Sequence, residues 1–345
     1  SAVFDESSWK AQESPLLQVT QDIWQVRLPL PYALDHVNVY LIQGETGWTI
    51  VDAGLNISKA RATWEFAFDE LAIGQDQVEK IVLTHMHPDH FGLAGWLQRR
   101  FSLSDIQVPV YASAEELAMY AGLWQVLDRS ERIELTMDGY FQACGIPREH
   151  AEAVTAGTLR TGSKTLPHPE FTPFPDGGIL KMGNRTWQMI HAPGHADGQF
   201  VFYDPNDALF LSGDQLLMKI TPNIGYWSDT QPGVLKRYLD SLLTLKQFDT
   251  RLGLPGHKWQ IADWQARIEE MLVHHEDRLN HTLTAVVKSP GITVNEVSKI
   301  VFRLGDLDIH QSRFAVAETL AHLDHLELKG SIDKETEEGV WHYTA

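Results

Sequence analysis

Apolar and polar residues alternate along the first part of the chain, which is typical of half-buried β-strands. Over residues 17–30, apolar side chains stand among polar neighbours, and we expect a strand bounded by two prolines. Two further strands are predicted over residues 38–42 and 48–51, joined by a glycine-containing turn. The opening of the chain therefore predicts a β-meander that ends at Asp52.

Helical periodicity then replaces the alternation. Residues 58–71 place Trp64 and Phe68 on one face, with Ser58 at the expected N-cap and Gly74 beyond the expected end. The following segment predicts a buried strand over residues 80–83, a helix ending near residue 100 and a short strand over residues 107–111.

Residues 113–155 change character and predict a helical insert of three helices. Ser113 and Glu116 form a capping-box pattern, and Pro147 suits the start of the third helix. Most aromatic residues here should pack in a core. An insert between strands often covers a site, however, so we expect a few side chains to line an apolar pocket. The residues predicted to line that pocket are Met119, Trp124 and Tyr140 from the insert, with Tyr226 and Trp227 from a later loop.

The second half returns to β-structure and then becomes helical. Strands are predicted over residues 179–182, 186–190, 199–203 and 208–211, followed by helices over residues 232–246, 263–287, 293–302 and 311–323. A two-stranded wing over residues 326–332 and 340–343, closed by an acidic turn, should end the chain.

Composition narrows the classes of function. With 28 basic and 46 acidic residues the net charge is −18, which argues against a nucleic-acid partner. A single cysteine, Cys144, excludes an intrachain disulfide and makes thiolate metal sites improbable. No apolar run is long enough to span a bilayer, and the first residues lack a signal pattern. We therefore expect a cytoplasmic protein with no membrane partner.

Metal-ligand side chains gather at the ends of predicted strands. Residues 84–90 read Thr-His-Met-His-Pro-Asp-His, and three later strand ends each bring one more ligand beside a glycine. Imidazole and carboxylate ligands of this number suit two borderline ions such as Zn²⁺, with Fe or Mn as alternatives. The candidate metal ligands are His85, His87, Asp89, His90, His195, Asp214 and His257.

Five motifs in order resemble those of the metallo-β-lactamase-fold metallohydrolases. They are residues 51–54, 84–90, 193–195, 213–214 and 256–257. The resemblance implies an α/β fold, a four-layer αβ/βα sandwich, over residues 17–260. It also implies that His85, His87 and His195 hold the first ion, that Asp89, His90 and His257 hold the second, and that Asp214 bridges them. Asp52 would lie behind these ligands and orient one of them.

The remaining segments flank this domain. Residues 1–16 are predicted to be a loose lead-in. Residues 261–345 resemble the small winged-helix-like C-terminal domain of the branch typified by lactamase-β-like protein 2. From residue 288 onward there are six basic and ten acidic residues, a difference of −4, so we interpret this domain as a packing or homodimer module and expect no nucleic-acid contact.

The resemblance and the ligands together imply hydrolysis by a water activated between two ions, with Asp89 and Asp214 as catalytic carboxylates. His87 stands where the di-iron branch typically has Glu, which favours a zinc hydrolase. The expected substrate is a small, partly apolar ester, thioester or lactone. The alternatives are an endoribonuclease, an enzyme like the mononuclear-iron persulfide dioxygenases, and a non-catalytic binding module.

Overall fold

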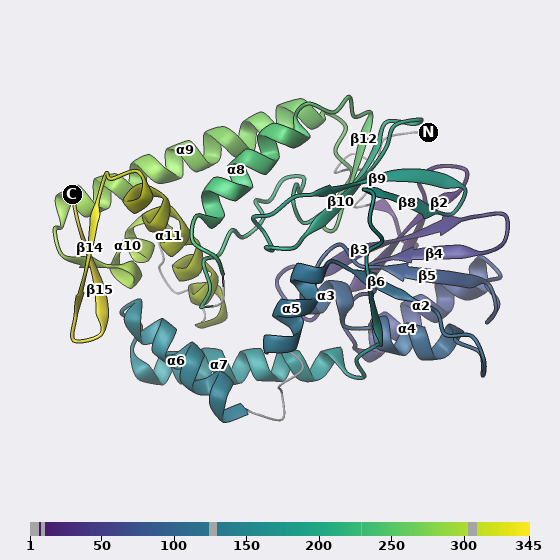
Figure 1. The fold of residues 1–345 in the computed structure, drawn as a ribbon, viewed down its shortest axis with the longest axis horizontal. Helices are drawn as coiled ribbons and strands as arrows, with labels where there is room; N and C mark the ends of the chain where they lie inside the picture. The colour runs from purple at the N-terminus through teal and green to yellow at the C-terminus, as the bar shows by residue number, and fades with distance from the viewer. Residues whose placement is uncertain (1–6, 8–10, 124–129, 229, 303–308) are drawn as a thin grey trace.

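The computed structural model describes residue 7 and residues 11–123, 130–228, 230–302 and 309–345. Two large β-sheets occupy one half of the molecule, on the right in Figure 1. The first has seven strands in sequential order, antiparallel up to β4 and parallel from there on. Its strands are β1 Leu16–Gln18, β2 Ile23–Pro29, β3 His36–Gln43, β4 Trp48–Val51, β5 Val78–Val82, β6 Val110–Ala112 and β7 Phe171–Pro173.

The second sheet has five strands in the order β12-β11-β10-β9-β8. All neighbours are antiparallel except β11 and β12, which run parallel. The strands are β8 Ile179–Met182, β9 Arg185–His191, β10 Phe200–Asp204, β11 Leu209–Gly213 and β12 Leu252–Pro255. Ile23 and Val82 of the first sheet share one buried cluster with Trp187 and Phe202 of the second, so the two sheets face each other.

Helices cover both outer faces of this pair of sheets. Helices α2 Ser58–Glu70 and α4 Ala94–Phe101 pack on the first sheet, and α3 Pro88–Phe91 lies in the loop between β5 and α4. Helices α8 Val234–Leu245 and α9 Trp264–Lys288 pack on the second sheet. The predicted four-layer αβ/βα sandwich is therefore confirmed.

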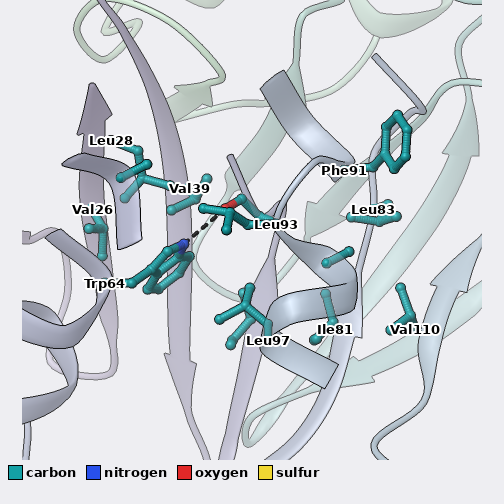
Figure 2. Close-up of a cluster of buried hydrophobic side chains, with 14 of the residues drawn as sticks. Val26, Leu28, Val39, Trp64, Ile81, Leu83, Phe91, Leu93, Leu97 and Val110 are labelled. Carbon is teal, nitrogen blue, oxygen red and sulfur yellow. Dashed lines mark hydrogen bonds between the residues drawn. The ribbon is translucent and has the colours of Figure 1, made fainter. Parts of the chain in front are cut away.

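A tryptophan under the first sheet links its core to the chain beyond β4. Trp64 is fully buried in a cluster that includes Leu28, Val39 and Leu97 (Figure 2). Its indole nitrogen donates a hydrogen bond of 2.8 Å to the carbonyl of Ala53, which follows Asp52. Packing of α2 thus fixes the position of a loop that leaves the end of a strand.

The helical insert lies between β6 and β7 and is seated on the C-terminal part of the chain. It comprises α5 Ala114–Leu123, α6 Ser130–Ala143, α7 Arg148–Gly162 and the short 3₁₀ helix η2 Ser163–Thr165, so it extends beyond residue 155. Phe141 of α6 and Val154 of α7 share a buried cluster with Val286 and Tyr343. Figure 1 shows α6 and α7 running beside the C-terminal helices.

The C-terminal part forms a small module of its own on the end of α9. After α9 come β13 Ile292–Thr293, α10 Val294–Val301, α11 Ile309–Leu328, β14 Asp333–Glu337 and β15 Val340–Thr344. The three strands form a sheet in the order β13-β15-β14. The winged-helix assignment stays a prediction.

Four predicted elements were wrong in their limits or their cap. The wing strand expected over residues 326–332 is absent, because α11 continues to Leu328 and the acidic segment 333–337 is itself a strand. Every residue of that strand is exposed, so it shows no alternation. The turn is reduced to Glu338 and Gly339, whose positive φ angles of 48° and 84° suit a tight hairpin.

The other three errors concern the first half of the chain. Residues 17–30 form two antiparallel strands, β1 and β2, because the chain reverses over residues 19–22. Helix α2 begins at Ser58 itself, with Ile57 at the N-cap and no side-chain cap. The helix expected to end near residue 100 is divided into α3 and α4 around residues 92–93.

Among the described residues, no helix is long and apolar enough to cross a membrane.

Candidate metal centre

Four strand ends bring the candidate ligands to one edge of the sandwich. The segment after β5 carries residues 85–90, and the loop between β9 and β10 carries His195. Asp214 directly follows β11, and His257 follows β12. All seven predicted ligand side chains belong to groups whose ligand atoms lie within 4.8 Å of one another.

The first group consists of His85, His87 and His195. The Nε2 atom of His85 lies 3.0 Å from the Nδ1 atom of His87. The His195 ring centroid lies 5.0 Å from that of His85 and 4.5 Å from that of His87, with the ring planes nearly perpendicular. The three imidazoles therefore converge on one point, as three ligands of a tetrahedral ion do.

The second group consists of Asp89, His90 and His257, and Asp214 lies between the two groups. One oxygen of Asp214, Oδ2, is 3.1 Å from Nε2 of His257 and 3.6 Å from Nε2 of His195. Its other oxygen is 3.4 Å from Nε2 of His90. This carboxylate is thus within reach of ligands from both groups.

The inner atoms of the site fit a metal better than they fit the protein alone. Nε2 of His90, Nε2 of His195 and Oδ1 of Asp214 are buried and have no hydrogen-bond partner. Buried polar atoms without partners are rare and costly, and a bound metal ion would give these three atoms a partner. A Cβ atom at Gly256 would lie 2.2 Å from Oδ1 of Asp214, so only glycine permits this close approach.

Outer hydrogen bonds orient the imidazoles. Nδ1 of His195 bonds the carbonyl of Asn223 at 2.9 Å, and Nδ1 of His257 bonds the carbonyl of His36 at 2.7 Å. Because a carbonyl can only accept, each Nδ1 carries a proton, and each Nε2 is the nitrogen that faces inward. Asn223 and His36 carry no local sequence signal for this role, and the sequence-based prediction missed both.

Asp52 lies next to two of the candidate-site residues, Thr84 and His90. Its carboxylate accepts hydrogen bonds from the Thr84 backbone at 2.9 Å and from the Thr84 hydroxyl, and it contacts Nδ1 of His90 at 2.8 Å. The Thr84 hydroxyl in turn contacts Nδ1 of His85 at 2.9 Å. Asp52 has a φ of 62°, a left-handed conformation that non-glycine residues adopt at a cost.

The two groups differ in charge in the metal-free protein. Burial lowers the pKa of His85 well below its usual range. Burial and the neighbouring His195 together lower the pKa of His87 to about 3. These imidazoles are therefore neutral at pH 7 and have lone pairs available for an ion.

The second group behaves in the opposite way. Burial opposes charge on His257, but Asp214 and Asp89 raise its pKa to about 9. Burial likewise disfavours the charged form of Asp214, yet His257 and His90 hold its pKa well below the usual range. Metal binding here would displace protons from the imidazoles, which makes metal affinity depend on pH.

Glu116 is a further residue that the sequence-based prediction assigned to another role. It was read as half of a capping box; Ser113 does cap α5, accepting from the Glu116 backbone at 3.1 Å. The fully buried Glu116 carboxylate instead accepts from the backbone of Met86 at 2.6 Å and of Gly198 at 2.9 Å. It therefore ties the insert to the loops that carry the histidines of the first group.

Three of the predicted pocket residues belong to, or pack against, the core that the insert shares with the C-terminal module. Tyr140 is buried in the core that α6 and α7 share with the C-terminal module, and its hydroxyl donates to the carbonyl of Tyr226. Tyr226 and Trp227 pack against that same core. Met119 is half-buried on α5, and Trp124 lies outside the described residues.

Two sequence comparisons bear on this site. Residues 32–257 match the family model described as the metallo-beta-lactamase superfamily. The chain belongs to this superfamily. Residues 279–345 match the model described as the metallo-beta-lactamase-like C-terminal domain. The resemblance inferred from the five motifs is therefore confirmed.

Relatives extend over nearly the whole chain. A metallo-beta-lactamase family protein from Thermus thermophilus has a similar structure, with a TM-score of 0.80, 31% identity and coverage of 95% of this chain and 99% of that one. A beta-lactamase domain protein from Burkholderia ambifaria gives a TM-score of 0.82, 30% identity and coverage of 95% and 94%.

Two curated relatives carry functional names. The probable metallo-hydrolase YqjP of Bacillus subtilis is 24% identical over 323 residues, covering 91% of this chain and 94% of the relative. The linear primary-alkylsulfatase of a Pseudomonas species is 24% identical over 266 residues, covering 74% of this chain and 48% of the relative. The chain is accordingly a metallo-hydrolase of the superfamily.

Proposed function

We propose that this metallo-hydrolase holds two zinc ions and cleaves an ester, thioester or lactone bond in a small, partly apolar substrate. The observation that carries the proposal is the position of Asp214. Its Oδ2 atom lies near a ligand of each group, at 3.6 Å from His195 and 3.1 Å from His257. A carboxylate placed in this way suits a bridge between two ions.

The donor set supports zinc. It offers imidazole nitrogens and carboxylate oxygens, and the single thiol, Cys144, lies buried in the core shared with the C-terminal module. Zinc accepts such ligands readily, and Fe or Mn would accept them as well. His85, His87 and His195 would hold one ion, Asp89, His90 and His257 the other, and Asp214 both.

Two bound ions would supply an activated water and polarise the oxygen on which charge develops. The protein would supply the rest. Asp89 is the most accessible carboxylate of the set, with 23% of its side chain exposed, against 8% for Asp214. It would accept the proton of the attacking water, while Asp52 would keep His90 in place through its 2.8 Å contact.

The alternatives are less well supported. The net charge of −18 argues against an endoribonuclease, so we propose that the protein has no nucleic-acid partner. The structure groups Asp89 and His90 with His257, which is more than a mononuclear iron site needs. The alkylsulfatase among the relatives makes sulfate esters a second candidate substrate class.

The test begins with metal-depleted protein reloaded with zinc. It is then assayed on aryl esters, thioesters, lactones, phosphotriesters, β-lactams, alkyl sulfates and RNA. We expect turnover of at least one carboxylic ester, thioester or lactone, loss of it in Asp214→Ala, and no loss in His150→Ala. His150 lies on the insert with about half of its side chain exposed, and it belongs to neither ligand group. Cleavage of RNA without any acyl substrate would reject the proposal.

A further inference from the structure

Arg313, near the start of α11, is a partly buried cation. Its Nη1 atom donates a hydrogen bond of 2.7 Å to the Thr158 hydroxyl on α7, and its guanidinium lies 4.4 Å from the centre of the Phe314 ring. Its Nε atom is buried without a hydrogen-bond partner. Among the described residues, no carboxylate forms an ion pair with it.

Several other partly buried arginines of the described chain are paired with acidic residues. Elsewhere in the described chain, the partly buried arginines 185, 237 and 267 each pair with a carboxylate at 2.7 Å or less. An unpaired buried charge is costly, and burial indeed lowers the pKa of Arg313. With no carboxylate paired to it among the described residues, the guanidinium is available to an anionic ligand.

Two hydrogen bonds link the chain next to Arg313 to the candidate metal centre. The carbonyl of Asn223 supports the metal ligand His195, and the Asn223 amide donates to the carbonyl of Phe314 at 3.2 Å. Phe314 is the next residue after Arg313. Hydrogen bonds through Asn223 therefore connect the backbone next to Arg313 with the first ligand group, although the two lie far apart in the sequence.

A second cation and two aromatic rings lie in the same region. The hydroxyl of Tyr32 is 3.4 Å from that of Thr161, one turn after Thr158 on α7. Lys164 places its amino group 5.5 Å from the centre of the Tyr32 ring. Tyr32 and Phe314 are both about two-fifths exposed, at 42% and 41%. This region therefore combines the positive charge of Arg313 and Lys164 with the accessible apolar surface of Tyr32 and Phe314.

We propose that Arg313 binds an anionic group at the far end of the substrate, with Tyr32 and Phe314 contacting the apolar part in between. The planar guanidinium can bind a carboxylate or a sulfate through two parallel hydrogen bonds. The proposal rests on the proposed hydrolase function and adds the class of substrate: a small amphiphilic molecule with an acidic end group.

Binding to the metal-depleted full chain tests this without turnover. The probes are the monomethyl ester of hexanedioic acid, which carries one carboxylate, its neutral dimethyl ester, and hexyl sulfate. We expect Arg313→Met to weaken binding of the monoester by about ten- to 100-fold, as expected for loss of a charge-assisted hydrogen bond, and to leave the diester unchanged. Arg148→Met, an exposed arginine on α7, changes the net charge equally and should alter neither.

Arg313→Lys provides a second variant that keeps the charge but loses the planar geometry, and it should bind the monoester with intermediate affinity. Tight hexyl sulfate binding that depends on Arg313 would identify sulfate as the preferred anion and would also support the subsite. Equal binding of mono- and diester by the unaltered protein, or equal losses in the Met variants at positions 313 and 148, would overturn it.

Reloaded enzyme separates this inference from the proposed function. If the neutral diester is hydrolysed and Arg313→Met raises KM for the monoester alone, the proposed function and the anion site are both supported. If neither of these esters nor any other acyl substrate of the panel is hydrolysed, but monoester binding still requires Arg313, the proposed acyl-bond function fails and the anion site remains. If both esters are hydrolysed with no preference that depends on Arg313, the anion site fails alone.

Discussion

At the scale of single residues, Asp52 shows how structure outside the ligand set controls the ligands. It adopts a left-handed backbone conformation, is almost completely buried, and receives hydrogen bonds from Thr84 and His90. The carbonyl of the next residue is held by Trp64 in the core. Local strain is therefore maintained by packing, and the carboxylate has one position from which it can orient two histidines.

Replacing Asp52 by asparagine tests this role. The amide has one accepting oxygen, so its nitrogen would face a donor from Thr84 or His90. We expect metal affinity to fall about 10- to 100-fold, as for other residues that support ligands, measured by competition with a chelator. Asp69→Asn, on the exposed face of α2, is the control. An affinity equal to that of the unaltered protein would contradict the assigned role.

Glu318 makes stability depend on pH. Burial raises its pKa to about 7, against the opposing effects of Arg278 and the Asn223 hydrogen bond. Because the folded pKa exceeds the unfolded value, this contribution is fully present below about pH 4.5 and is lost as the pH rises through 7. In the metal-depleted protein, we expect Glu318→Gln to add on the order of 1–3 kcal/mol to the unfolding free energy at pH 8 relative to pH 5. The unfolding free energies are measured by denaturant titration at both pH values. If Glu318→Gln differs from the unaltered protein by the same amount at pH 5 and pH 8, this role of Glu318 is excluded.

At the scale of elements, the strand ends were the most predictable part of the molecule. A buried strand and the candidate ligands that follow it are adjacent in the sequence. Local patterns therefore located β3, β4, β5 and the segment 84–90. Supporting residues such as Glu116 and Asn223 act across 28 or more positions, and no local pattern reveals them. The strand β14 was not predicted, because all of its residues are exposed and its sequence therefore shows no alternation of apolar and polar residues.

Glu116 connects α5 to the segment around Met86 and to the loop around Gly198. Its replacement by glutamine should weaken both connections. Each carboxylate oxygen now accepts one backbone N–H, whereas a glutamine would place its own N–H₂ against one of these donors. We expect a loss of about 1–3 kcal/mol in unfolding free energy together with weaker retention of metal by the first ligand group. The neighbouring Glu115→Gln, on the exposed face of α5, should change neither quantity. If the two variants behave alike, Glu116 does not position the ligand loops.

At the scale of the whole molecule, the insert and the C-terminal module share one core. Phe141, Cys144 and Val154 come from the insert, while Val286 and Tyr343 come from the end of the chain. The backbone of Asn295 also donates to the carbonyl of Cys144 at 2.9 Å. Sequence analysis located both helical segments but could not show that they pack on each other, because that contact joins residues more than 130 positions apart.

Phe141→Ala tests whether this shared core holds the two segments together. Deleting a fully buried ring should cost about 3–5 kcal/mol, and limited proteolysis should then cut both the insert and the C-terminal module. Phe66→Ala removes a ring that is 40% exposed on α2 and should cost far less. Cleavage confined to the insert would show that the two segments are independent.

The central claim is that two ions, bridged by Asp214, support hydrolysis. Calorimetric titration of metal-depleted protein with zinc, run beside an ester-hydrolysis assay at each addition, tests it most directly. The account predicts two equivalents bound per chain, activity that rises with the second, and loss of both features in Asp214→Ala. Full activity at one equivalent, or unchanged activity in Asp214→Ala, would contradict it.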